Sequence, residues 1–166
     1  MSRKLPIRLN KELTKNLLKD VENFLFDCDG VIWNWPKPLD GAVAAINMLK
    51  SMGKRCFFVT NNSTKTREMI VKQFDSIGVS NVIEDDIVCT AWVLAQYLKS
   101  INFKEKCYVI GNPSMAKELD DAGIQHTGIG STFPHFPDPS NFDYKKNITL
   151  DPTVKCVVVG YDHHFS

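Results

Sequence analysis

The sequence lacks the features that would place a chain of 166 residues outside ordinary globular proteins. Its 20 Lys and Arg residues nearly balance its 19 Asp and Glu residues, so the net charge of +1 does not point to nucleic acid or to an anionic membrane surface. It has no apolar run near the roughly 20 residues that a membrane-spanning helix needs. Hydrophobic residues make up 43% and charged residues 23%, which excludes a disordered tail. We therefore expect a globular protein whose partners include neither nucleic acid nor membrane.

The five cysteines form neither a disulfide framework nor a zinc site, because their number is odd and no Cys-x-x-Cys pair occurs. Cys56, Cys107 and Cys156 each open a short apolar run, where a reduced thiol serves as a small hydrophobic group. Reduced cysteines are typical of intracellular compartments, so we expect a cytoplasmic protein.

The first twenty residues carry basic side chains but no apolar run of the kind that a secretory signal contains. Leu13, Leu17 and Val21 recur at helical spacing, which predicts an N-terminal helical extension over residues 1–22 that packs on the domain. A mitochondrial presequence is the alternative, although two acidic residues in this stretch are unusual in one.

Short apolar runs alternate with amphipathic stretches along the chain, an order typical of βαβ units around a parallel sheet. The first run, Phe-Leu-Phe at residues 24–26, is continuous, which predicts a strand covered on both faces. The predicted strands are residues 24–26, 56–59, 87–88, 108–110 and 157–159. The predicted helices are residues 41–52, 64–77, 91–98 and 113–122, the last with Asn112 as its cap and proline at its first position. The fold class is therefore α/β.

Two aspartates, Asp27 and Asp29, directly follow the first predicted strand in the motif Phe-Leu-Phe-Asp-Cys-Asp-Gly. Residues i and i+2 of an extended chain face the same side, and parallel sheets bind ligands beyond the carboxyl ends of their strands. Neighbouring carboxylates repel each other, so one stays ionised as a nucleophile while the other holds a proton as a general acid. Gly30 allows the backbone to approach a ligand closely. The alternative is an ordinary turn, in which Asp-x-Asp-Gly is also common.

A polar segment, Thr-Asn-Asn-Ser-Thr, occupies the matching place after the second predicted strand. Thr60, Asn61 and Asn62, with the free N–H groups of the following helix start, predict a phosphate cradle, whereas taken alone the segment is more typical of a helix cap and a turn. A phosphate beside two carboxylates requires a cation, and Mg²⁺ bridges carboxylate and phosphate oxygens. The implied reaction is phosphoryl transfer to an aspartate, followed by hydrolysis of the acyl phosphate.

Four motifs together resemble the haloacid dehalogenase superfamily, and within it the 4-nitrophenylphosphatase and phosphoglycolate phosphatase group. They are Phe-Leu-Phe-Asp-Cys-Asp-Gly-Val-Ile-Trp, Val-Thr-Asn-Asn-Ser-Thr, Tyr-Val-Ile-Gly and Val-Val-Val-Gly-Tyr-Asp, and the resemblance runs from about residue 11 to the last residue. It implies a Rossmann-like core with a parallel sheet, of which only a part is present, and the beginning of an α/β cap domain. We accordingly assign residues 23–86 to the first half of the core and residues 87–166 to a linker and a partial cap.

The resemblance also implies a role for each candidate residue. Asp27 would be the nucleophile that becomes phosphorylated, and Asp29 the general acid and base, both of them contributing to the magnesium site, Asp29 through its backbone carbonyl. Thr60 and Asn61 would hold the phosphate, and Asn62 would line the site. The implied activity is Mg²⁺-dependent hydrolysis of small phosphorylated metabolites, such as phosphoglycolate or 4-nitrophenyl phosphate, by a homodimer formed through the cap.

The sequence departs from the family pattern in two motifs. It has no lysine in a Gly-Lys-Pro setting, which neutralises the phosphate, and no Gly-Asp with further acidic residues, which completes the magnesium site. Residues 84–86, Glu-Asp-Asp, predict a solvated turn and helix cap, while residues 160–162, Gly-Tyr-Asp, resemble the family's entry into the cap. His163 and His164 are adjacent, and adjacent side chains rarely bind one ion. We therefore expect the chain to stop inside the cap.

These departures leave two classes of function open. A phosphatase is the first, although we expect little or no turnover from the chain acting alone, because the absent groups stabilise the transition state. The alternative is a non-catalytic form, at most a binding or interaction protein. A receiver-type phosphoacceptor domain is excluded, since it needs an adjacent acidic pair after the first strand. Trp33 and Trp35 are predicted to pack rather than contact substrate, and residues 133–142 to form a surface loop.

Overall fold

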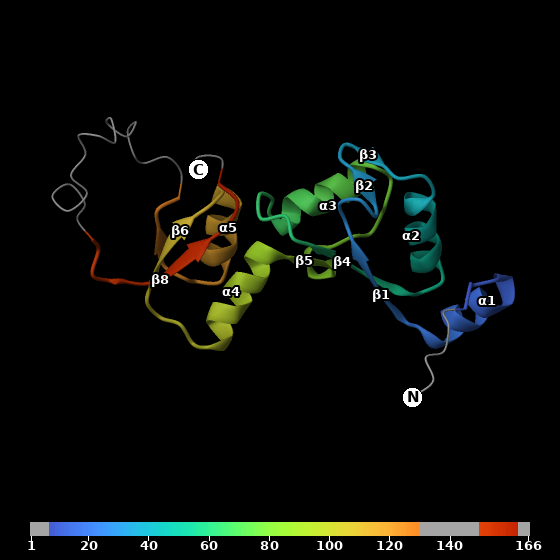
Figure 1. Ribbon diagram of the computed structural model, residues 1–166, viewed down its shortest axis with the longest axis horizontal. Helices are drawn as coiled ribbons and strands as arrows, with labels where there is room; N and C mark the ends of the chain where they lie inside the picture. Colours follow the sequence, from blue (N-terminus) through green and yellow to red (C-terminus); the bar gives the residue numbers. More distant parts are fainter. Residues whose placement is uncertain (1–6, 130–149, 163–166) are drawn as a thin grey trace.

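The computed structural model describes residues 7–129 and 150–162, which form two α/β units connected by a helix (Figure 1). Each unit contains a three-stranded parallel sheet, with the order β1-β4-β5 in the first and β7-β6-β8 in the second. The strands are β1 (Asn23–Asp27), β4 (Arg55–Thr60), β5 (Ile87–Cys89), β6 (Lys106–Ile110), β7 (His126–Thr127) and β8 (Val154–Val159). The helices are α1 (Lys11–Asp20), α2 (Ala42–Ser51), α3 (Arg67–Ser76), α4 (Thr90–Ser100) and α5 (Pro113–Asp121). The α/β class with parallel sheets is confirmed.

Helices α2 and α3 pack on one face of the first sheet (Figure 1), and on the opposite face the side chains of Leu25 and Val59 are exposed to solvent. Phe58 of β4 is fully buried on the covered face, where its ring centroid lies 4.1 Å from that of Phe74 in α3. On the opposite face Leu25 of β1 is 70% exposed. The prediction that the run at residues 24–26 is covered on both faces is therefore wrong for the part of the chain that the structure describes. A continuous apolar run does not reveal which face a helix will cover.

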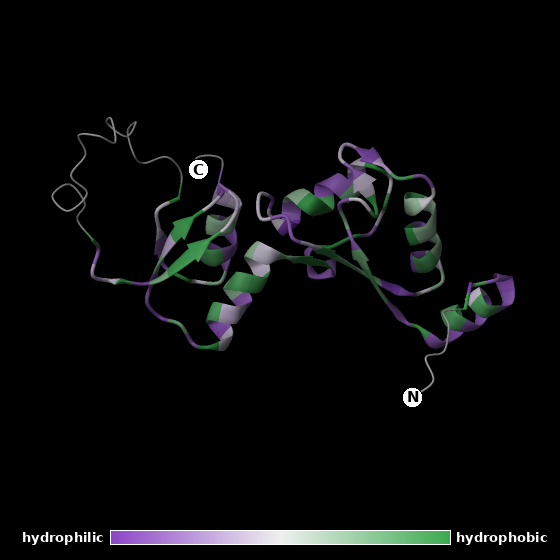
Figure 2. Ribbon diagram, in the orientation of Figure 1, coloured by the Kyte–Doolittle hydropathy of each residue, from purple (hydrophilic) through white to green (hydrophobic). Residues whose placement is uncertain are grey.

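In the second unit, the buried residues lie between its sheet and helix α5, and they belong to the same hydrophobic cluster as the buried residues of the first unit. Cys107 and Val109 of β6 and Leu119 of α5 are fully buried. Figure 2 shows hydrophobic residues along β6 and β8. The second unit is thus a packed layer of sheet and helix, with α4 lying against α5 beside it.

Local capping decides where two of the predicted helices begin. Helix α3 starts at Arg67 rather than at residue 64, because the side chain of Thr66 accepts a hydrogen bond from the N–H of Met69 and caps the first turn. Helix α5 starts at Pro113, and the side chain of Asn112 accepts a hydrogen bond from the N–H of Ser114. The second start is as predicted.

The predicted N-terminal helix forms, but it does not pack through the predicted stripe. The side chain of Asn10 caps α1 by accepting hydrogen bonds from two backbone N–H groups. Leu13 and Leu17 are 36% and 44% exposed, and α1 contacts the hydrophobic core through Leu18 instead. The packing of Leu13 and Leu17 on the domain is therefore corrected.

The sequence patterns miss an antiparallel hairpin, β2 (Trp33–Asn34) and β3 (Lys37–Pro38), and the short strand β7. The acidic turn at residues 84–86 is a single turn of 3₁₀ helix, η1 (Glu84–Asp86). The boundary that we placed after residue 86 lies directly before β5, which pairs with β4 and so continues the first sheet.

Some sequence predictions lie outside the described residues: residues 1–6 of the N-terminal extension, the loop at residues 133–142 and the pair His163 and His164. Within the described ranges, none of the helices has the length and apolar character needed to cross a bilayer.

Candidate active site

The carboxyl ends of the three strands in the first sheet meet at one edge, where the predicted site residues lie. The register pairs Asp27 at the end of β1 with Val59, and Thr60 at the end of β4 with Cys89. Parallel pairing places the residues that follow each strand at the same edge. Four of the five predicted residues line two neighbouring pockets there: Asp29, Thr60, Asn61 and Asn62.

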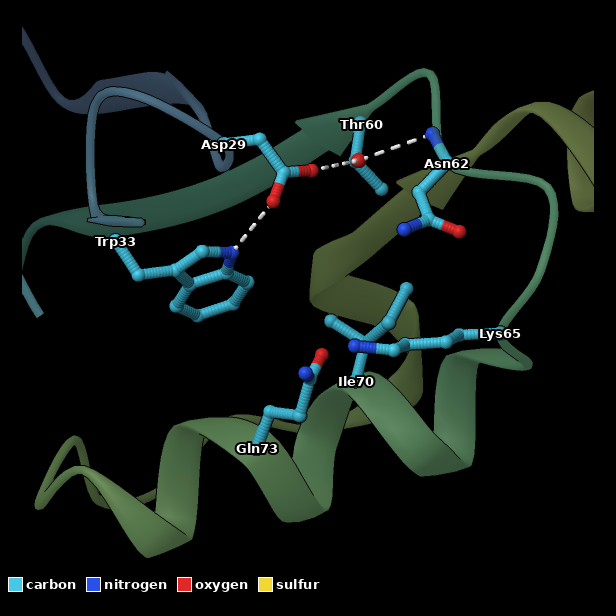
Figure 3. Close-up of a pocket in the computed structure, with 7 residues that line it drawn as sticks. All are labelled: Asp29, Trp33, Thr60, Asn62, Lys65, Ile70 and Gln73. Carbon is cyan, nitrogen blue, oxygen red and sulfur yellow. Dashed lines mark hydrogen bonds between the residues drawn. The ribbon is translucent and has the colours of Figure 1, made fainter. Parts of the chain in front are cut away.

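The carboxylate of Asp29 is held from two sides (Figure 3). The indole N–H of Trp33 donates to Oδ1 at 2.9 Å, and the hydroxyl of Thr60 makes a longer contact of 3.5 Å with Oδ2. Trp33 is 3% exposed, and its ring centroid lies 4.8 Å from that of Phe74. Trp33 therefore packs in the core as predicted, and it also orients a carboxylate at the site.

Asp27 is exposed at the end of β1 and does not line either of these two pockets. Its Oδ1 accepts a hydrogen bond of 2.8 Å from the backbone N–H of Cys28, which leaves Oδ2 available. Burial, and then the charges of Asp29 and Asp27, raise the pKa of the Cys28 thiol to about 12. The thiol between the two aspartates therefore stays protonated at neutral pH and does not compete as a nucleophile.

The polar loop after β4, residues 60–66, is organised by its own side chains. The hydroxyl of Thr60 accepts from the N–H of Asn62 at 3.1 Å. The side-chain oxygen of Asn62 accepts from both the N–H and the hydroxyl of Thr64, each at 2.8 Å.

The loop leads into the N-terminus of α3, where the helix dipole favours an anion. The Arg67 N–H at this end donates to the Glu118 carboxylate, and the Met69 N–H donates to the Thr66 side chain. Because the sequence predicts a phosphate cradle in this segment, we refer to residues 60–66 as the phosphate-binding loop, after that prediction.

Groups from beyond this loop enlarge the site. The hydroxyl of Thr90, which follows β5, donates to the carbonyl of Asn61 at 3.3 Å. The N–H of Tyr161, which follows β8 of the second unit, donates to the hydroxyl of Ser63 at 3.1 Å. A pocket of about 380 Å³ is lined by Asp29, Asn61, Asn62, Ser63, Thr64 and Tyr161. This volume lies within the range of small-molecule sites.

Two further side chains of the first unit, missed from the sequence, face the same carboxylate. Lys65 and Gln73 line a cavity of about 10 Å³ together with Asp29 (Figure 3). Burial lowers the pKa of Lys65, while the charge of Asp29 acts in the opposite direction. Its ammonium nitrogen lies 4.8 Å from the ring centroid of Trp35, a cation–π contact. The Gln73 Nε2 is buried and has no hydrogen-bond partner among the residues that the structure describes.

The two aspartates are the candidate ligands for a cation. In the described ranges, no group of three or more His, Cys, Asp or Glu side chains is placed to hold a metal ion. Mg²⁺ does not need such a group, because it binds through one or two carboxylates plus substrate phosphate and keeps several waters. By their donor chemistry, Asp27 and Asp29 therefore fit a divalent cation that binds together with a phosphate ester.

Comparison with known proteins gives consistent matches. Residues 24–125 match the family described as haloacid dehalogenase-like hydrolase. The chain is 42% identical to phosphoglycolate phosphatase 1A, chloroplastic, of Arabidopsis thaliana, with 93% of this chain and 42% of that protein covered. It is 36% identical to glycerol-3-phosphate phosphatase of Mus musculus, with 96% of this chain and 51% of that protein covered. The chain therefore spans about half the length of these relatives, or less.

Solved structures of a glycerol phosphate phosphatase from Mycobacterium tuberculosis share the fold. The complex with calcium has a TM-score of 0.65 at 18% identity, covering 90% of this chain and 38% of that chain. The complex with magnesium has a TM-score of 0.59 at 22% identity, covering 66% of this chain and 33% of that chain. The first of these matches extends over both units of the present structure.

Proposed function

Because the chain belongs to the haloacid dehalogenase-like hydrolase family, we propose that it contributes the nucleophile, the general acid and the phosphate-binding loop of a magnesium-dependent phosphatase. The observation that carries this proposal is the Asp29 carboxylate, which is fixed by Trp33 and faces the loop at residues 60–66. A carboxylate held in one orientation beside an anion-binding loop is suited to proton transfer at a bound phosphate ester. The names of the relatives support this function over the non-catalytic alternative.

The two aspartates divide the chemistry between them. Asp27 attacks phosphorus through Oδ2, because the Cys28 N–H occupies Oδ1, and forms an aspartyl phosphate as the ester P–O bond breaks. Asp29 gives its proton to the leaving oxygen. It then takes a proton from the water that attacks the acyl phosphate, which releases inorganic phosphate and restores Asp27.

Magnesium and the loop would balance the charge of the bound phosphate. Asp27 and the backbone carbonyl of Asp29 are the proposed Mg²⁺ ligands, and the ion supplies charge neutralisation between carboxylate and phosphate. Thr60 and Asn61 hold the phosphate oxygens, with Asn62 supporting the loop. Lys65 adds a positive charge close to Asp29.

The substrate class is inferred from the pocket and from the relatives. A pocket of about 380 Å³ beside the loop accepts a small phosphorylated metabolite, of which phosphoglycolate and 4-nitrophenyl phosphate are the proposed examples. We assign the first unit to the core and the second unit to part of the cap. Dimerisation through the cap and a cytoplasmic location remain predictions.

The test is hydrolysis of 4-nitrophenyl phosphate and phosphoglycolate by the purified 166-residue chain with Mg²⁺. We expect at most slow turnover, because the Gly-Lys-Pro lysine and the Gly-Asp acidic motif are absent from the sequence. Asp27→Asn should abolish it, whereas Asp75→Asn, an exposed aspartate on α3, should not change it. Beryllofluoride, which adds to a carboxylate in place of phosphate, gives a second measurement by ¹⁹F NMR. Turnover and beryllofluoride binding that both survive Asp27→Asn would refute the proposal.

A further inference from the structure

Helix α5 of the second unit contacts the first unit at the end of the phosphate-binding loop (Figure 1). The Glu118 carboxylate accepts two hydrogen bonds from Arg67, the first residue of α3, with Oε1 3.2 Å from the backbone nitrogen and Oε2 3.3 Å from Nε. The hydroxyl of Ser114, one turn earlier on α5, donates to the carbonyl of Thr64 at 2.8 Å. Three hydrogen bonds from one helix therefore hold both sides of the junction between the loop and α3.

The two polar side chains on α5 are buried, whereas the charged residues Lys117 and Asp121 on the same helix are exposed. Glu118 is 3% exposed and Ser114 is 6% exposed, while the side chains of Lys117 and Asp121 are 54% and 45% exposed. A buried carboxylate is costly unless it is paired and hydrogen-bonded, and Arg67 supplies both conditions for Glu118. A carboxylate is also favourable at the N-terminus of α3, where it satisfies a free N–H.

The Arg67 side chain is held in place by further contacts. A displacement of Glu118 therefore also displaces Arg67 and the end of the loop that leads into it. The Arg67 guanidinium lies 3.4 Å from the carboxylate of Glu84 and 4.0 Å from that of Asp85, both in η1 of the first unit. Its Cζ lies 5.6 Å from the ring centroid of Trp92 in α4. The start of α3 is thus held by the acidic turn, by α4 and by α5 together.

We propose that Glu118 and Ser114 are positioning residues: from the second unit, they hold the start of α3 and thereby keep the phosphate-binding loop in the conformation that binds phosphate. This inference rests on the proposed function of the loop. Under this proposal the second unit contributes to phosphate binding indirectly. Glu118 and Ser114 contact the loop and the start of α3, and they do not contact the phosphate. The affinity of the first unit for phosphate then depends on the docking of α5.

The experiment compares α5 variants of the 166-residue chain. Isothermal titration with inorganic phosphate and Mg²⁺ gives the dissociation constant, and hydrogen exchange measured by NMR reports on the amides of residues 62–67. We expect Glu118→Ala to raise the phosphate dissociation constant about tenfold, within the usual range of coupling between sites, and to speed exchange at these amides. Glu118→Gln keeps an acceptor oxygen for the Arg67 N–H and should restore most of both properties.

Asp121→Asn is the matched control, because Asp121 lies on the exposed side of the same helix, and it should leave both measurements unchanged. If Glu118→Ala does not fold, Ser114→Ala removes one hydrogen bond to the loop and provides the same test with a smaller expected change. Folded variants with unchanged phosphate affinity and unchanged exchange would overturn the proposal. If the wild-type chain binds no phosphate, the proposed function fails, and the exchange rates alone then decide whether α5 orders the loop.

Discussion

The two sheets of this protein are built alike and differ in the residues that lie just beyond their strands. Both are three-stranded and parallel, yet the strands of the first sheet lead into aspartates, a threonine and amides, whereas β6 and β8 of the second lead into Gly111 and Gly160. A side chain at either glycine would overlap the sulfur of Met115, which is 3% exposed. Met115 therefore lies directly beside the two glycines, at the strand ends where other parallel sheets bind a ligand.

A parallel sheet alone does not make a ligand-binding site. A parallel sheet offers the carboxyl ends of its strands as a place for a ligand, but the residues after those strands decide which polar groups are present there. The second sheet contributes differently, because Val157, Val158, Val159 and Gly160 form one wall of a cavity of about 670 Å³ between the units. Its residues shape the approach to the first sheet's polar edge.

The largest effect that we predict concerns the support beneath the first sheet. Phe74→Ala should reduce the free energy of unfolding by about 3–5 kcal/mol, because it leaves a cavity under Phe58 and Trp33. Urea denaturation measures the loss. Phe57→Ala, a change of the same size on the open face of the sheet, should cost clearly less. Equal losses at the two positions would contradict the assignment of the covered face.

The second prediction tests the polar edge itself. Asp29→Asn should lower turnover about 10²- to 10⁴-fold, the usual contribution of general acid–base catalysis. The comparison is made with Asn112→Asp, which places a carboxylate after β6 in the second sheet and preserves the cap of α5. That variant should gain no Mg²⁺ binding by calorimetry. A loss of turnover below tenfold in Asp29→Asn, or new Mg²⁺ affinity in Asn112→Asp, would contradict the claim that only the first sheet carries a site at its strand ends.

The third prediction tests the strand ends of the second sheet. Gly160→Ala should destabilise the fold by about 1–3 kcal/mol through overpacking against Met115. Combined with Met115→Ala, the substitution should cost less than the sum of the two single changes, because residues that share one space are coupled. The measurement is a double-mutant cycle of unfolding free energies. Simple additivity would show that Met115 and a side chain at residue 160 do not share one space.

The smallest effect concerns an ion pair at the opposite end of the second sheet. Hydrogen bonds from Thr153 and Lys106 lower the pKa of Asp151 from 3.8 to about 2. Because the folded state holds the lower pKa, the resulting stability is present above pH 3.8 and is lost as the pH falls towards 2. Asp151 is exposed, so the change is slight. Unfolding measured from about pH 2 to 5 should have a shallower slope in Asp151→Asn, and Asp75→Asn should not alter it.

Much of this architecture was predictable from local patterns. Apolar runs located the strands, and the placement of Asp29, Thr60 and Asn61 after successive strands brought them to one edge because parallel pairing leaves no other arrangement. Capping residues such as Asn112 also mark a helix start directly in the sequence. Such signals are local, so they can be recognised without knowing which segments pack against each other in the fold.

Contacts between distant segments were not predictable in this way. Glu118 lies 51 positions from Arg67, and nothing in either neighbourhood distinguishes a buried charge from a solvated one. Lys65 was the exception that a signal could have revealed, since a lysine directly after the Thr-Asn-Asn-Ser-Thr segment is well placed for an anion. The exposure of Leu25 was not predicted. An apolar side chain indicates a tendency to be buried, but it does not show which helix or strand would cover it.

The three tryptophans give this molecule a set of built-in optical probes. Trp33 is buried and donates to Asp29, Trp35 lies under the ammonium of Lys65, and Trp92 lies under the guanidinium of Arg67. Each indole therefore reports on a different event. Trp33 responds to a ligand that binds at Asp29, Trp35 to a movement of Lys65, and Trp92 to the release of the second unit from Arg67. Variants that keep a single tryptophan would separate these three events by intrinsic fluorescence.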